Sequence, residues 1–60
     1  MKPASYYVKR RKPSASNMIW FTQNIFLTRE AAEEELAKGQ EKGWEYAIFH
    51  MGEVIARRSV

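Results

Sequence analysis

The sequence contains no cysteine and no aspartate, and it has only one histidine, two prolines and three glycines. Without cysteine, neither a disulfide framework nor a thiolate zinc site is available. No apolar run approaches the roughly 20 residues of a membrane-spanning helix, and no apolar signal segment follows Met1. The hydrophobic fraction of 45% is too high for a disordered chain. We therefore expect one small, soluble, cytoplasmic domain covering residues 1–60.

Groups that could support catalysis or bind a metal are scattered along the chain. His50 has no thiol or aspartate to act with, which argues against nucleophilic catalysis and against a transition-metal site. Glu33, Glu34 and Glu35 are consecutive, so on a helix they point in different directions and do not form a carboxylate pair. The three glycines are too far apart for a phosphate-binding loop. We expect a protein that is not an enzyme and that uses no cofactor and no metal.

Charge is unevenly distributed. Residues 1–29 carry six cations and no carboxylate, whereas residues 30–60 carry four cations and seven glutamates, a sum of −3. Four cations, Lys9, Arg10, Arg11 and Lys12, are consecutive. Concentrated cations attract polyanions, because binding releases condensed counterions. The same run could also serve only to keep a hairpin tip soluble, and the sequence leaves both interpretations open.

The pattern of residue types predicts four strands and one helix. Aromatic and β-branched residues indicate strands at 6–10, 18–22, 44–50 and 54–58. The first two strands would form a hairpin whose residues 11–17 are a flexible basic loop, and residues 1–5 are expected to be disordered. The order is β-β-α-β-β, an α+β fold in which one helix packs on a mainly antiparallel sheet in two layers.

The helix has clear start signals. Thr28 is a favoured N-cap, and residues 29–42 contain no proline and many strong helix formers. Gly43 follows where a left-handed C-terminal cap belongs. We predict a helix over 29–42 with Ala32 and Leu36 on its buried stripe and its glutamates on a solvated face.

The last two strands are predicted to meet at a two-residue turn, Met51-Gly52. This turn would pair Phe49 with Val54, Ile48 with Ile55, Tyr46 with Arg57 and Glu45 with Arg58. Because the helix stripe is small, bulky sheet residues must fill the space beneath it, and we expect these to be Trp44, Tyr46, Ile48 and Ile55. Phe49, Val54, Ala47 and Ala56 would then face outward and leave an apolar strip for a partner or a second copy of the chain.

Aromatic residues flank the cationic run. The strand period puts Tyr6 and Val8 on one face and Tyr7 and Lys9 on the other. Exposed rings can stack nucleic-acid bases while neighbouring cations neutralise phosphates. The candidate nucleic-acid-binding residues are Tyr7, Lys9, Arg10, Arg11, Lys12, Trp20, Arg57 and Arg58.

Two stretches resemble small β-rich nucleic-acid-binding domains. Residues 26–32 (FLTREAA) with Glu35-Leu36 resemble the F-x-T-x-x-x-A helix opening of the hybrid-binding domain of some ribonucleases H and of the arm-binding domain of tyrosine recombinases. Residues 6–12 are similar to the first strand of the hybrid-binding domain. In those families this region contacts the nucleic-acid backbone, so the resemblance implies a DNA or RNA partner recognised by shape or backbone.

A second interpretation is a protein-interaction module. The helix followed by Gly43-Trp44-Glu45 resembles small uncharacterised bacterial and phage proteins, which implies a phage or mobile-element inhibitor of a host protein. The interaction would use the apolar strip, with Phe49 and Val54 as its centre, or a free sheet edge.

Overall fold

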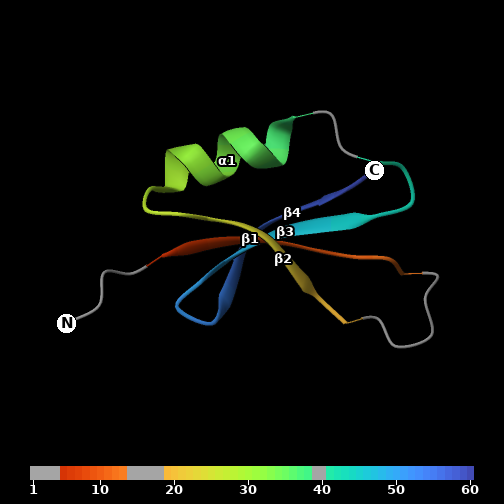
Figure 1. The fold of residues 1–60 in the computed structure, drawn as a ribbon, viewed down its shortest axis with the longest axis horizontal. Coiled ribbons are helices and arrows are strands. Elements are labelled where there is room, and N and C mark those ends of the chain that lie inside the picture. Colours follow the sequence, from red (N-terminus) through yellow and green to blue (C-terminus); the bar gives the residue numbers. More distant parts are fainter. Residues whose placement is uncertain (1–4, 14–18, 39–40) are drawn as a thin grey trace.

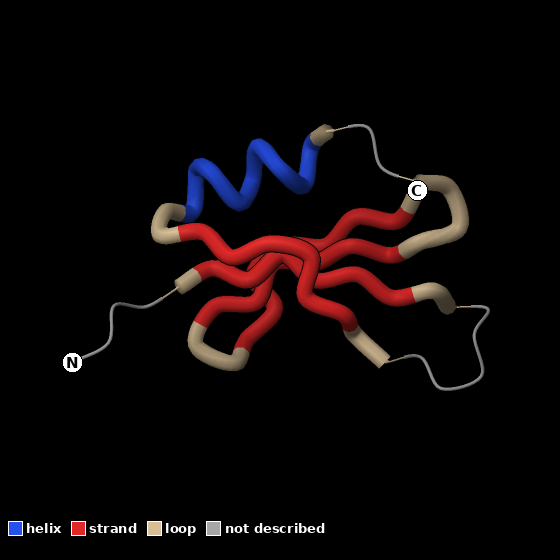
Figure 2. The backbone as a smooth tube through the Cα atoms, in the orientation of Figure 1, coloured by secondary structure: helices blue, strands red, loops and turns tan. Residues whose placement is uncertain are grey.

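A computed structural model describes residues 5–13, 19–38 and 41–60 of the chain. They form strands β1 (Tyr6–Arg11) and β2 (Phe21–Phe26), helix α1 (Arg29–Ala37), and strands β3 (Glu45–His50) and β4 (Glu53–Ser59). All strand pairs are antiparallel, in the order β2-β1-β3-β4. Helix α1 lies along one face of this sheet, so the chain forms two layers (Figures 1 and 2). The predicted α+β fold with β-β-α-β-β order is confirmed.

The core lies between α1 and the two central strands, β1 and β3. Val8 of β1 is directly opposite Ile48 of β3, and both side chains are fully buried. Ala32 and Leu36 face them from the helix. The sheet residues that complete the core are Tyr46, which is buried, and Tyr6, Phe26, Trp44, Ile55 and Ala56, which pack against it. The prediction that Trp44, Tyr46, Ile48 and Ile55 lie beneath the helix is therefore confirmed.

The β3–β4 hairpin turns at Met51-Gly52, as predicted. Both residues have positive φ angles, 52° and 80°, which are the backbone conformation of a two-residue hairpin turn. Phe49 pairs with Val54, also as predicted.

Beyond the Phe49–Val54 pair the predicted register is wrong by one residue. Ile48 pairs with Ala56 and not with Ile55, because a β-bulge interrupts the ladder between Ile48 and Phe49. A bulge places two residues opposite one, and here it lets both Ile55 and Ala56 pack against the core. Ala56 therefore does not face outward. For the same reason the partner of Tyr46 is Arg58 and that of Glu45 is Ser59.

The second strand runs from Phe21 to Phe26 and so lies further along the chain than the predicted 18–22. Residue 18 is outside the described residues, and Trp20 precedes the strand. The strand continues to Phe26 because that side chain pairs with Tyr6 and packs against the core. A second bulge, between Val8 and Lys9, gives β2 one extra residue.

The helix begins as predicted but ends earlier. The Thr28 hydroxyl accepts a hydrogen bond of 3.2 Å from the Ala31 amide, which makes Thr28 the N-cap. The helix ends at Ala37 and not at residue 42, and Lys38 is already extended. An Arg58 guanidinium nitrogen donates to the carbonyl oxygens of Leu36 (2.9 Å) and Lys38 (3.3 Å). Carbonyls at the end of a helix lack partners within it, so this cation from β4 stabilises the early end.

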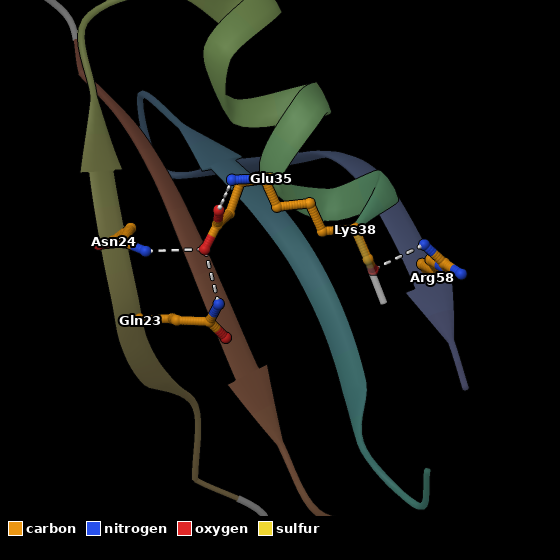
Figure 3. A network of polar contacts seen from close by, with 5 residues as sticks. All are labelled: Gln23, Asn24, Glu35, Lys38 and Arg58. Atoms are coloured by element: carbon orange, nitrogen blue, oxygen red, sulfur yellow. Dashed lines mark hydrogen bonds and ion pairs between the residues drawn. The ribbon is translucent and has the colours of Figure 1, made fainter. Parts of the chain in front are cut away.

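Glu35 joins the helix to the neighbouring strand (Figure 3). One of its carboxylate oxygens accepts hydrogen bonds from the side-chain amides of Gln23 (2.9 Å) and Asn24 (2.8 Å), and the other lies 3.4 Å from the Lys38 ammonium. The hydrogen bonds from Gln23 and Asn24 lower the pKa of Glu35 below its ordinary value of 4.5.

The N-terminal end of β1 is held by His50. The His50 ring stacks on Tyr6 with a centroid distance of 4.0 Å, and its Nδ1 lies 3.2 Å from the Ser5 carbonyl oxygen. A carbonyl can only accept, so Nδ1 carries the hydrogen in this contact. Disorder was predicted for residues 1–5 and flexibility for the loop 11–17, and of these, residues 1–4 and 14–17 lie outside the described residues. Arg11, which was placed in the loop, is the last residue of β1.

Candidate functional site

The strand period divides the four consecutive cations between two faces. Val8 points into the core beneath α1, so the side chains of Lys9 and Arg11 lie on the sheet face away from the helix, which we call the open face. Arg10 lies on the helix side, opposite Tyr46. The prediction that Tyr7 and Lys9 share a face is confirmed.

The ladder register identifies the other residues of the open face, because residues paired across strands share a face. The open face is formed by Tyr7, Lys9 and Arg11 of β1, Thr22 and Ile25 of β2, Glu45, Ala47 and Phe49 of β3, and Val54, Arg57 and Ser59 of β4. No helix among the described residues covers this face (Figure 1).

Three aromatic side chains form a group on the open face, which we call the ring cluster: Tyr7, Trp20 and Phe49. Tyr7 and Phe49 are direct partners on the two central strands. The Trp20 ring approaches Phe49 from the segment before β2, with a centroid distance of 5.3 Å and an interplanar angle of 73°. Tyr7 is 37% exposed, and Trp20 and Phe49 are half-buried. The cluster therefore brings together residues from three separate segments.

Cations lie directly over these rings. The Lys9 ammonium is 4.8 Å from the centre of the Phe49 ring and 5.7 Å from the centre of the Tyr7 ring. The Arg11 guanidinium carbon is 4.6 Å from the centre of the Trp20 ring. Each distance is within the range in which the negative ring face attracts a cation. In the unbound protein, the rings and the cations of the open face are thus partners of each other.

A carboxylate at the edge of the ring cluster joins two arginines. Glu45 accepts from Arg11 at 2.7 Å through one oxygen, and its other oxygen lies 2.9 Å from Arg57. The hydrogen bond from Arg11, followed by the attraction of both guanidinium groups, lowers the pKa of Glu45 below its ordinary value of 4.5. The three strand cations of the open face, less this carboxylate, leave a local charge of +2.

An apolar row crosses the whole sheet next to these charges. Ile25, Tyr7, Phe49 and Val54 follow one another across β2, β1, β3 and β4. Ile25 is 57% exposed and Val54 43%. The next row contains Ala47, which was expected to face outward into solvent but is fully buried. Its partners are Lys9 and Arg57, and long side chains such as these can cover a small neighbour with their methylene groups.

Three of the predicted nucleic-acid-binding residues lie elsewhere. Arg10 and Lys12 lie 4.5 and 5.9 Å from the centre of the Trp44 ring, and Trp44 packs against the core on the helix side. Arg58 contacts the end of α1. Conversely, Phe49 and Val54, which were assigned to a separate protein-interaction surface, lie on the same face as Tyr7 and Lys9.

The sequence interpretation missed Glu45 and Ile25. Glu45 was paired with Arg58 because the bulge was not foreseen, although a glutamate between two basic strands is itself a signal for an ion pair. Ile25 followed the end of the predicted second strand, so its face could not be assigned.

Other kinds of site find little support in the described part of the chain. Residues 5–13, 19–38 and 41–60 contain no cluster of three or more histidine or carboxylate side chains that could hold a metal ion, and no pocket opens among them. The helix in these ranges lacks the length and apolar character needed to cross a bilayer. Comparison with protein-family models, with curated proteins and with solved structures found no match to this chain.

Proposed function

We propose that this protein is a non-catalytic nucleic-acid-binding domain and that its open face is the binding surface. The observation that carries the proposal is the position of the Lys9 ammonium, which lies over the rings of both Tyr7 and Phe49 at 5.7 and 4.8 Å. Rings that stack bases and cations that neutralise phosphates are the two elements of nucleic-acid recognition by an open sheet. Here both elements share one face.

The local charge of the open face supports the same surface. The open face carries Lys9, Arg11 and Arg57 against a single glutamate. The helix on the other side exposes Glu30, Glu33 and Glu34. Cations on the helix side, among them Arg10, Arg29 and Arg58, offset these glutamates. Attraction of a polyanion therefore comes from the local charge of +2 on the open face.

Binding of fluorescently labelled oligonucleotides, followed by anisotropy at several salt concentrations, tests this proposal. We expect affinity to fall as the salt concentration rises. Lys9→Gln should remove about one phosphate contact, which makes the slope of log affinity against log salt concentration less steep by roughly 0.7–0.9. Lys38→Gln is the matched control, because Lys38 lies at the end of α1 and pairs with Glu35. Affinity that is unaffected by salt, or equal losses in the two variants, would contradict the proposal.

A second function, protein interaction, is favoured by the apolar row. Ile25 and Val54 end this row on the two edge strands, and neither has a charge to pair with phosphate or a ring to stack on a base. The double variant Ile25→Ser, Val54→Ser should abolish binding to a protein partner but leave oligonucleotide affinity within about twofold. The reverse pattern, lost oligonucleotide binding with the protein complex intact, would remove this second function.

A further inference from the structure

We infer that the nucleic acid bound by the open face is single-stranded and that its unpaired bases stack on the ring cluster, taking the positions that Lys9 and Arg11 occupy in the unbound protein. This inference rests on the proposed function and specifies its ligand. It follows from the width of the sheet, from the charge of the helix and from the contacts of the two cations.

The sheet is too wide to read a duplex from within its major groove. Four strands about 4.8 Å apart span roughly 14 Å before side chains are added. The major groove is about 12 Å wide and admits a helix or a two-stranded ribbon. The open face can therefore meet a duplex only from outside, where the bases are stacked and paired and cannot reach Tyr7 or Phe49.

Two elements narrow enough to enter a groove, helix α1 and the β3–β4 hairpin, have the wrong charge to do so. Helix α1 presents Glu30, Glu33 and Glu34 to solvent, and each would face phosphates on entering a groove. The β3–β4 hairpin ends in Met51, Gly52 and Glu53, none of which is a cation. Single strands have neither problem, since their bases can turn toward a surface while the backbone lies along it.

The contacts of the two cations explain how such a strand would bind. Lys9 lies over Phe49 and Tyr7, and Arg11 lies over Trp20, so each covers ring area that a base would need. Both side chains are long and end in groups that bind phosphate. When a base stacks on a ring, the displaced cation can pair with the phosphate of the same strand. In the unbound protein the cations thus cover the rings. On binding, a base takes the place of the cation on the ring, and a phosphate takes the place of the ring as partner of the cation.

The extent of the ring cluster sets the length of the segment bound. Tyr7 and Phe49 are direct partners on adjacent strands, and the centres of the Trp20 and Phe49 rings are 5.3 Å apart. Three rings in one group are the size of platform that accommodates about two to three bases. We expect short oligonucleotides to bind nearly as well as long ones at equal salt.

Four labelled ten-nucleotide probes separate stacking from charge: oligo(dT), oligo(U), an abasic deoxyribose-phosphate strand and a duplex. We expect the two single strands with bases to bind at least about tenfold more tightly than the abasic strand and the duplex, because one stacked base contributes roughly 5- to 150-fold in affinity. The ratio of oligo(U) to oligo(dT) affinity then shows whether RNA or DNA is preferred. Equal affinity for all four probes would overturn the inference yet leave the proposed function standing, whereas absence of binding to every probe would remove both.

Ring variants test the positions of the bases. Tyr7→Leu and Phe49→Leu keep an apolar side chain but remove the ring, and each should weaken oligo(dT) binding at least fivefold while leaving abasic-strand binding unchanged. Phe21→Leu is the matched control, because Phe21 is a 53% exposed ring paired with Arg10 on the helix side. Circular dichroism checks folding, and if Phe49→Leu is unfolded, the more exposed Tyr7 decides the result. Equal losses for oligo(dT) and the abasic strand, or losses as large for Phe21→Leu, would refute base stacking on the cluster.

Discussion

The guanidinium group of Arg58 donates a hydrogen bond of 2.9 Å to the carbonyl oxygen of Leu36, the last residue but one of α1. Its neighbour Arg57 points to the other side of the sheet, where it pairs with Glu45 at 2.9 Å. Two adjacent arginines in one strand therefore have different roles. Arg58 stabilises the end of α1, and Arg57 belongs to the open face.

Replacing each arginine by alanine should separate these roles. Arg58→Ala leaves end-of-helix carbonyls without their donor and should lower the free energy of unfolding by about 1.5–3 kcal/mol, the range for hydrogen bonds to charged groups. Arg57→Ala, with a side chain that is 56% exposed, should lower it by less than about 1 kcal/mol. Urea unfolding measures both values. Equal destabilisation by the two changes would contradict the assignment.

Stability should depend on pH through Glu35. Hydrogen bonds from Gln23 and Asn24 lower the pKa of this carboxyl in the folded state, so its stabilisation is fully present above the ordinary value of 4.5 and is lost as the pH falls through the folded-state pKa. We expect the melting temperature to fall below about pH 4.5 and Glu35→Gln to remove part of that fall.

Glu34→Gln is the control for this pH dependence, because Glu34 is an exposed neighbour on the same helix. Glu45 also has a lowered pKa and contributes in the same direction, so Glu35→Gln should flatten the profile without abolishing its slope. If thermal melts from pH 7 to pH 3 give identical profiles for the wild type and Glu35→Gln, the hydrogen bonds to Glu35 do not stabilise the fold.

The turn at residue 51 should be improvable. Met51 has a φ of 52° and is 80% exposed. Its left-handed backbone conformation is therefore unfavourable, and its side chain makes little packing contact that would compensate. Residues with a Cβ branch or long chain are disfavoured in this conformation by about 1 kcal/mol, whereas asparagine tolerates it. Met51→Asn should raise the melting temperature by about 2–6 °C. Met51→Leu keeps the strain, and a similar gain from it would show that the turn conformation is not the cause.

The parts of the fold that were predictable have local causes. Thr28 caps the helix because its hydroxyl reaches the amide three residues later. The Met51-Gly52 turn depends on the backbone conformation of these two residues and on the strands directly on either side. The residues beneath the helix were identified because Ala32 and Leu36 are too small to fill the core alone. The helix end was not predictable, since it depends on Arg58, 22 positions beyond Leu36 along the chain.

The candidate site was predictable in composition and only partly in geometry. Alternation along the first strand correctly put Tyr7 and Lys9 together. Two β-bulges then decide the rest: one shifts the partners of β3, and the other gives β2 an extra residue. A bulge is stabilised by the packing of residues on several strands, here Ile55 and Ala56 against the core, and no local sequence pattern marks it. This is why the predicted partners of Arg57 and Arg58, and with them the faces of these two residues, were wrong.

Removing the Glu45 carboxylate should strengthen nucleic-acid binding. Glu45 holds Arg11 at 2.7 Å and Arg57 at 2.9 Å, so a phosphate must compete with it for both guanidinium groups. Glu45→Gln keeps the shape of the side chain but raises the net charge by one from +3. We expect affinity for single-stranded oligonucleotides at low salt to rise about three- to tenfold, with a salt dependence steeper by about one phosphate contact.

The same change should cost the free protein some stability, because two ion pairs on the sheet lose their anion. Glu45 is only 14% exposed at its side chain, so the loss should be about 1 kcal/mol, more than a fully exposed pair would give. Anisotropy titrations and urea unfolding of the same variant measure the two effects, with Glu33→Gln as the control for a charge change on the helix, where Glu33 pairs with Arg29. Tighter binding with lower stability is the expected combination. Weaker or unchanged oligonucleotide binding by Glu45→Gln would mean that Arg11 and Arg57 do not contact phosphate.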